Sequence, residues 1–184
     1  RKLKIYFGDL IHNRHIYNYC VPLNVGYVNA TLKERFGDEI ETSIFKFPDD
    51  LISAMETSNP DVLALSNYDW HVNLNKAVIE IARRLNPDVL VVMGGPNIRK
   101  KPEGVKQYLL NHPIDMYVVN EGEDAFCGIL EYILGKQSSN FKQTISSSGV
   151  VLPGVAYLEN ETKQLMLGKK PDSASAKQIP FPSP

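Results

Sequence analysis

The sequence has 184 residues, of which 43% are hydrophobic and 22% are charged, and its formal net charge is -1. This composition is typical of a single soluble globular domain, and the near-neutral charge gives no general attraction to nucleic acid or anionic lipid, so neither is expected as a partner. No apolar run approaches the roughly 18 residues of a membrane span, and we expect a cytoplasmic protein. The two cysteines, Cys20 and Cys127, predict neither a disulfide framework nor a cysteine-ligated metal cluster.

Strands and helices alternate from the start of the chain. Leu3 to Phe7 is mostly apolar and predicts a strand, and after a long loop Pro22 begins a helix that ends at Gly37. Residues 40–47 predict a second strand. Pro48 then opens a short helix, which the Asn59-Pro60 pair ends.

The middle of the chain carries the clearest periodicity. A buried strand is expected over 61–66, and apolar residues between Leu74 and Leu85 recur at i, i+3, i+4, i+7, i+8 and i+11, which predicts an amphipathic helix. Four further elements follow in the same alternation. They are a strand over Val89–Met93, a helix around Val105–Leu110, a strand over Ile114–Val119 and a last long helix over Glu123–Leu134.

This alternation predicts an α/β fold of the doubly wound, flavodoxin-like or Rossmann-like type, with a five-stranded parallel sheet and helices on both faces. We expect this domain over residues 1–136. Residues 137–170 contain serine-rich loops and a predicted antiparallel β-hairpin, formed by 150–158 and 164–167. Residues 171–184 predict an extended linker.

A ligand of such a sheet binds beyond the carboxyl ends of the strands, where the winding changes direction. The segments expected there are 8–21, 66–71 and 94–99. The first is long for a strand-to-helix connection and carries Asp9, His12 and Tyr17, which suit either ligand binding or a solvated loop that packs on the domain. No G-x-G-x-x-G or Walker-type loop is present, so binding of a dinucleotide or of a nucleoside triphosphate is disfavoured. A receiver domain is also disfavoured, because the third strand ends on Ser66-Asn67 where such a domain needs aspartate.

The fourth predicted strand ends in VVMGGPN, residues 91–97. The two successive glycines leave the backbone without side chains at the point where the chain leaves the sheet. Either a large ligand approaches the backbone there, or the pair forms a tight turn whose exit Pro96 sets.

Several elements together resemble the N-terminal cobalamin-binding domain of cobalamin-dependent radical SAM enzymes. The likeness covers nearly the whole chain. Its residues are Pro22 with Gly26-Tyr27, 60–66, 91–96, 114–126, 154–156 and 179–182.

The resemblance implies that the nucleotide tail of cobalamin, detached from cobalt, enters a slot beside the sheet while the corrin ring lies across the strand ends. A Cβ at Gly94 or Gly95 would intrude on this slot, and Ser66 would offer its hydroxyl to the tail. Glu121-Gly122 closes the fifth strand, and a catalytic carboxylate is not expected there, because Gly122 makes a turn and Glu123 favours the positive end of a helix. No catalytic or metal-ligating residue is assigned. The implied cofactor-binding residues are Asp9, His12, Tyr17, Ser66, Asn67, Tyr68, Gly94, Gly95, Pro96, Asn97, Glu121 and Gly122.

The cobalamin domains of methionine synthase and the mutases carry D-x-H-x-x-G after the first strand, and its histidine binds cobalt. Here Asp9 and His12 have the wrong spacing. Asp69-Trp70-His71 has the D-x-H spacing but follows the third strand and lacks the glycine, and we expect Asp69 to cap a helix. No histidine is therefore expected to bind cobalt. If one does, the candidates are His12 and His15 of the loop after the first strand.

The resemblance also implies a second domain. The C-x-x-x-C-x-x-C of a radical SAM barrel is absent from the sequence, and the prolines of the linker resemble the connection into that barrel. The [4Fe-4S] cluster and S-adenosylmethionine would bind there, and methylcobalamin would be presented to it for radical-based methyl transfer or a non-methylating reaction. The alternative is a non-enzymatic, flavodoxin-like domain that binds a small molecule or regulates a partner.

Overall fold

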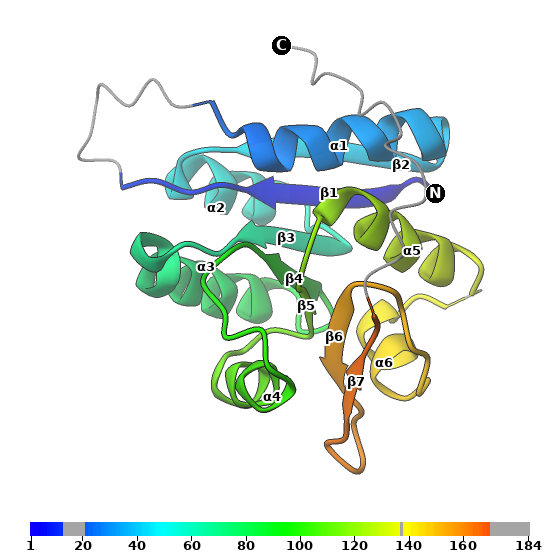
Figure 1. The fold of residues 1–184 in the computed structure, drawn as a ribbon. Coiled ribbons are helices and arrows are strands. Elements are labelled where there is room, and N and C mark those ends of the chain that lie inside the picture. The colour runs from blue at the N-terminus through cyan, green and yellow to red at the C-terminus, as the bar shows by residue number, and fades with distance from the viewer. Residues whose placement is uncertain (13–20, 137, 170–184) are drawn as a thin grey trace.

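The computed structural model describes residues 1–12, 21–136 and 138–169 (Figure 1). Strands and helices alternate as predicted through α5. The elements are β1 (Leu3–Gly8), α1 (Leu23–Phe36), η1 (Gly37–Glu39), β2 (Ile40–Phe45), α2 (Pro48–Thr57), β3 (Val62–Ser66), η2 (Asp69–His71), α3 (Val72–Leu85), β4 (Leu90–Gly94), α4 (Pro102–Asn111), β5 (Met116–Val118), α5 (Gly122–Leu134), α6 (Phe141–Ser146), β6 (Val155–Leu158) and β7 (Leu165–Leu167).

The strands form one sheet in the order β2-β1-β3-β4-β5-β6-β7. The first five strands are parallel, which confirms the doubly wound, flavodoxin-like fold. The predicted hairpin is present, but it continues the sheet, so the sheet has seven strands rather than five. The pairing is antiparallel, with Met116 opposite Tyr157, and it covers the edge that β5 would otherwise expose.

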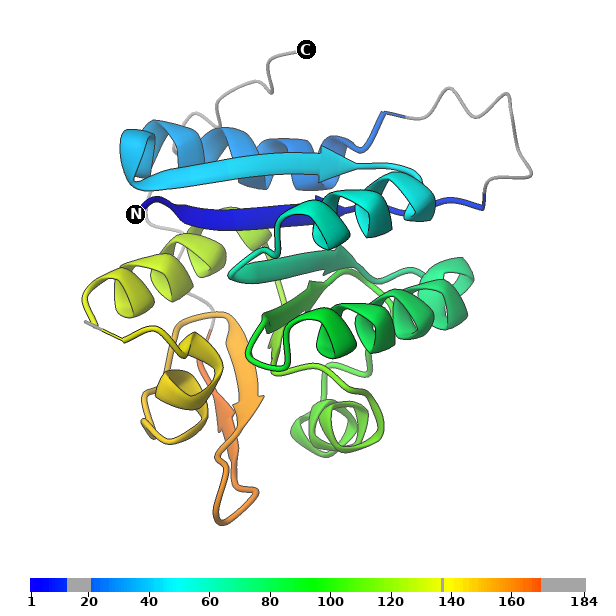
Figure 2. The same cartoon turned by 180° about the vertical axis from the view of Figure 1, so that it is seen from behind.

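Helices cover both faces of the sheet (Figures 1 and 2). One core contains Ile5 and Phe7 of β1 together with side chains of α1, α5 and α6, and the other contains Tyr6 together with side chains of α2, α3 and α4. Alternate residues of a strand therefore enter opposite cores. This explains why the central strands read as unbroken apolar runs: all five residues of β3 are buried.

Two local expectations were wrong. Asp69 does not cap α3: it lies in η2, and the N-cap of α3 is His71, with no hydrogen bond from its side chain. No helix was predicted between the serine-rich loops at 137–140 and 146–148, but α6 lies there. The Asn140 side chain caps its start by accepting a 2.9 Å hydrogen bond from the Gln143 amide. Ile145 anchors this short helix in the core.

No helix in the described part of the chain combines the length and apolar character that a membrane crossing requires. The predicted linker, 171–184, lies outside the described residues.

Candidate functional site

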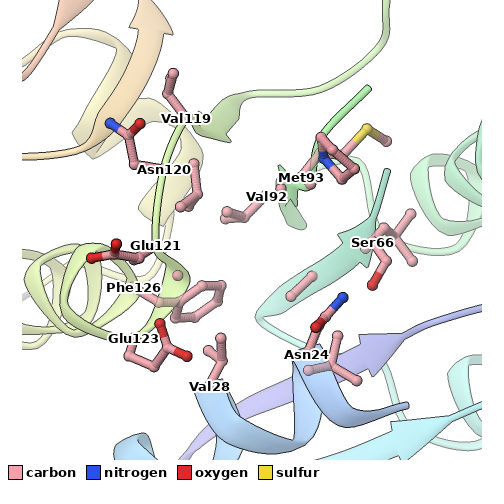
Figure 3. Close-up of a pocket in the computed structure, with 18 of the residues that line it drawn as sticks. Asn24, Val28, Ser66, Val92, Met93, Val119, Asn120, Glu121, Glu123 and Phe126 are labelled. Carbon is pink, nitrogen blue, oxygen red and sulfur yellow. The ribbon is translucent and has the colours of Figure 1, made fainter. Parts of the chain in front are cut away.

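A cavity of about 520 Å³ opens at the carboxyl ends of β1, β3, β4 and β5, between the sheet and the first turns of α1 and α5 (Figure 3). The winding changes direction here, because β1 and β3 are neighbours while α1 and α3 pack on opposite faces. The cavity therefore lies at the predicted switch point.

The cavity walls are apolar. Phe7 of β1 and Phe126 of α5 lie with ring centroids 5.6 Å apart and planes inclined by 45°. Val28 of α1 and Val92 of β4 approach the same space, and the Phe126 ring points into it (Figure 3). Such walls suit a flat, largely apolar group.

Polar groups lie around this apolar interior. The Asn24 amide of α1 donates a hydrogen bond to the hydroxyl of Tyr68, which joins α1 to the segment after β3 across the cavity. Carboxylates from the start of α5 lie on the side opposite Ser66 (Figure 3). The polar and charged lining residues are Asn24, Tyr27, Ser66, Tyr68, Lys100, Asn120, Glu121 and Glu123.

The two glycines after β4 serve different purposes. Gly95 has a φ of 136°, and a Cβ there would lie 2.5 Å from the Asn67 carbonyl oxygen, so the protein's own backbone requires glycine. A Cβ at Gly94 would lie 3.4 Å from the Val118 Cβ, an ordinary contact with another cavity-lining residue. A Cβ at Gly95 would collide with Asn67 whether or not a ligand enters the slot, so the need for glycine there has a structural cause of its own, and the expected intrusion on a ligand slot stays a prediction.

Asn67 is completely buried, and its hydrogen bonds hold this turn in place. Its side-chain amide donates to the Asn97 carbonyl at 2.8 Å and to the Tyr117 hydroxyl at 2.9 Å. Its backbone amide donates to the Gly94 carbonyl at 2.6 Å. Asn67 is thus placed to shape the cavity rim through its neighbours, and it is not among the residues that line the cavity.

Two flat aromatic side chains lie beside the cavity. The rings of Tyr68 and Trp70 stack with centroids 4.9 Å apart and planes inclined by 7°. Both rings lie nearly perpendicular to the imidazole of His71. Because Trp70 is 67% exposed while Tyr68 lines the cavity, the pair forms an exposed aromatic surface next to the cavity.

The imidazole of His71 is buried beneath these rings, with 2% of the residue exposed. Its Nδ1 lies 3.4 Å from the Ser66 carbonyl oxygen and 4.0 Å from the Asp9 carboxylate. Burial lowers the pKa of His71, and the nearby Asp9 charge opposes this shift. The neutral form is therefore favoured in the folded protein.

The structure brings most of the predicted residues together. The cavity is lined by Ser66, Tyr68, Gly94, Gly95, Pro96, Glu121 and Gly122. The others lie elsewhere: Asn67 is beneath the turn, Asp9 faces His71, His12 is exposed outside the lining, and Asn97 lines an adjoining open pocket that shares Tyr68 and Pro96 with the cavity. Tyr17 and His15 lie outside the described residues.

Sequence reasoning missed the helix contributions. Asn24 and Val28 of α1 and Glu123 and Phe126 of α5 line the cavity, and each pair lies about one turn apart at the start of its helix. That spacing, at the starts of two predicted helices, was the available signal. Lys100 was missed because the segment after β4 carries no periodicity. Among the residues that the structure describes, no three or more His, Cys, Asp or Glu are arranged to hold a metal ion.

Known relatives match the chain over part of its length. It is 38% identical over 74 residues to the 2-(S-pantetheinyl)-carbapenam-3-carboxylate methyltransferase of Streptantibioticus cattleyicolor, and 39% identical over 72 residues to the cobalamin-dependent radical SAM methyltransferase TokK of Streptomyces tokunonensis. These matches cover 40% and 39% of this chain, but only 10% of each relative.

Solved structures share the fold. The apo form of the cobalamin-dependent S-adenosylmethionine radical enzyme OxsB superposes with a TM-score of 0.69 at 15% identity, covering 99% of this chain and 24% of that one. The form of OxsB with aqua-cobalamin bound superposes with a TM-score of 0.68 at 13% identity, covering 92% of this chain and 22% of that one.

The segment from 11 to 130 matches the B12 binding domain family. It contains β2 to β4, the turn at Gly94-Gly95, the Tyr68–Trp70 pair and the start of α5, which together form most of the cavity. The chain therefore belongs to the B12 binding domain family.

Proposed function

We propose that the chain is the cobalamin-binding module of a radical SAM enzyme and that the cavity receives the nucleotide tail of cobalamin. The observation that carries this proposal is the position of the cavity: it lies at the switch point of the sheet and is built mainly from the segment that matches the family. Asn67 and the two glycines give its rim a fixed shape.

The lining fits the chemistry of the tail. A benzimidazole base is flat and apolar, which suits a space bounded by Phe126, Val28 and Val92. Ribose hydroxyls and a phosphate need polar partners, which Ser66 and Asn120 supply at the rim. The base would enter between α1 and α5, away from cobalt.

The corrin ring would lie across the strand ends, next to the Tyr68–Trp70 pair. Trp70 exposes 67% of its surface, and an exposed indole gains by packing against a broad, partly apolar ring. The adjoining pocket offers Asn97, Gln107 and Asn111, whose amides match the carboxamide groups at the edge of the ring.

We further propose that no histidine within the described residues binds cobalt. The Nδ1 of His71 is directed at Ser66 and Asp9, and the ring is enclosed beneath the aromatic pair. His12 is exposed and does not line the cavity. Cobalamin held in this cavity would therefore receive no cobalt ligand from His71 or His12.

The parent protein would be a methyltransferase or a related radical enzyme. The chain spans about a tenth of the curated relatives it matches, which supports a longer parent protein that would supply the rest of the chemistry. Cobalamin, when bound, supplies a transferable methyl group. The described residues would hold and orient it, while a following radical SAM domain, with its [4Fe-4S] cluster and S-adenosylmethionine, would act on the substrate.

The first test is to mix the purified chain with hydroxocobalamin, remove free ligand by gel filtration and record the visible spectrum of the protein peak. We expect corrin to co-elute, with the spectrum of the base-off form. A base-on spectrum would contradict tail binding in the cavity. A colourless peak, repeated with the full-length protein, would contradict cobalamin binding and favour a flavodoxin-like regulatory domain.

A further inference from the structure

We propose that Lys100 binds the phosphodiester of the cobalamin tail, and that it makes the site selective for corrinoids with a complete nucleotide. This inference rests on the proposed function and adds a specificity-determining residue to the same site. It starts from the charges of the cavity.

Three charged side chains line the cavity: Lys100, Glu121 and Glu123. The two carboxylates come from the start of α5 and lie opposite Ser66 (Figure 3). The tail carries one permanent negative charge, on its phosphodiester. This charge would be repelled by the carboxylates and attracted by the ammonium group, so charge alone orients the tail.

Lys100 lies in the connection between β4 and α4, which leaves the sheet at Gly94, between Ser66 of β3 and Val118 of β5. Successive residues of this connection face different parts of the surface. Arg99 lines the adjoining pocket, Lys100 lines the cavity, and Lys101 is the N-cap residue of α4 and lines neither. The direction of the backbone therefore assigns one cation to the cavity.

The ammonium of Lys100 is available for a ligand. Within residues 1–12, 21–136 and 138–169, it forms no ion pair with a carboxylate. A lysine ammonium has three hydrogen-bond donors and no acceptor, which suits phosphate oxygens. The Ser66 hydroxyl and the backbone of the glycine turn provide neutral contacts nearby but do not offset the carboxylates.

The test compares two ligands. Hydroxocobalamin carries the phosphodiester and the base, whereas cobinamide keeps the corrin ring and lacks both. Lys100→Gln removes the charge while keeping a polar chain of similar length. Lys101→Gln makes the same change at the next residue, which is also exposed but lines no pocket, and is the matched control.

We expect Lys100→Gln to weaken binding of hydroxocobalamin about three- to tenfold, because a partly exposed, charge-assisted hydrogen bond is lost. Binding of cobinamide should change less than about twofold, and Lys101→Gln should change neither ligand's affinity by more than that. The affinity of the original chain for hydroxocobalamin should also fall more steeply with salt than that of Lys100→Gln.

The outcomes separate the two proposals. Suppose that the original chain binds hydroxocobalamin. If the Lys100→Gln variant binds it equally well, or if the substitution lowers the affinity for hydroxocobalamin and for cobinamide by the same factor, the role of Lys100 is overturned while cobalamin binding stands. The same holds if Lys101→Gln has as large an effect. If the original chain binds no corrinoid, the proposed function fails, and the role of Lys100 fails with it.

Discussion

The hydroxyl of Tyr117 donates a 2.8 Å hydrogen bond to the carbonyl oxygen of Gly95, and this bond ties β5 to the turn that follows β4. The same hydroxyl accepts a 2.9 Å hydrogen bond from the Asn67 amide, which comes from the end of β3. Three neighbouring strands are thus joined at one buried oxygen. The rim of the cavity is therefore held by two buried side chains, Asn67 and Tyr117, that do not line it.

The substitution Tyr117→Phe should therefore remove both hydrogen bonds of this hydroxyl, which help to hold the turn after β4. We expect the free energy of unfolding to fall by about 1–2 kcal/mol, because the Gly95 carbonyl and the Asn67 amide each lose a buried partner. We also expect the affinity for hydroxocobalamin to fall, with that for cobinamide changing less. Urea unfolding and spectroscopic titration measure these quantities.

Tyr157→Phe is the matched control for this variant. Tyr157 is also buried and its hydroxyl donates a 2.7 Å hydrogen bond to the Val150 carbonyl, but it lies on β6, away from the cavity. It should lower stability by a comparable amount and leave both ligand affinities unchanged. Equal loss of hydroxocobalamin affinity in the two variants would show that Tyr117 acts only through global stability.

The glycine pair should respond unequally to alanine. Gly95→Ala places a Cβ at 2.5 Å from the Asn67 oxygen in a backbone with positive φ, so we expect a loss of about 1–3 kcal/mol or more in the free energy of unfolding. Gly94→Ala meets only an ordinary contact with Val118 and should cost less than about 1 kcal/mol. It should still weaken cobalamin binding, because the added methyl enters the lining.

Thermal unfolding and spectroscopic titration of both variants check this difference. A Gly95→Ala protein as stable as the original would mean that the turn can relax. A Gly94→Ala protein with unchanged affinity would mean that the tail does not approach β4. Because Gly95→Ala strains the turn itself, Gly94 is the cleaner probe of the ligand.

His71 should make stability depend on pH. Burial lowers its pKa in the folded state below the unfolded value of about 6.5, so the unfolded chain binds a proton more readily. The stability that neutral His71 contributes is therefore complete above this value and is lost as the pH falls through the folded pKa. We expect the free energy of unfolding to decrease from pH 7 towards pH 5, with a smaller slope in His71→Gln. Parallel slopes in the two proteins, measured by urea unfolding, would contradict this assignment.

The order of strands and helices could be predicted because both sheet faces are covered. Unbroken apolar strands such as 62–66 and the helical periodicity of 74–85 report burial directly. The helix α6 was missed because its six residues hold a single fully buried side chain, Ile145, and too few turns to establish a period. Its signal was the Asn140 cap with Gln143 three residues later.

The site was predictable where strand ends define it. Ser66 and Gly94 follow directly from strand boundaries and the switch-point rule. The burial of Asn67 could not be predicted, because alternation along a strand breaks down in the turn that follows and its side-chain partner, Tyr117, is 50 residues away. The role of Gly95 likewise depends on a contact with another segment, which a local pattern does not report.

Trp70 provides the last prediction, because it is the single tryptophan of the chain and is 67% exposed beside the cavity. Cobalamin absorbs strongly across the range of tryptophan emission, so a corrin ring bound next to this indole should quench its fluorescence by energy transfer. We expect saturable quenching on titration with hydroxocobalamin, corrected for absorption with free N-acetyltryptophanamide, and the same midpoint as the spectroscopic titration. Cobinamide should quench as well, since its ring is intact. If corrin co-elutes with the protein while the corrected fluorescence is unchanged, the ring lies away from the Tyr68–Trp70 pair, and the orientation proposed for it is wrong.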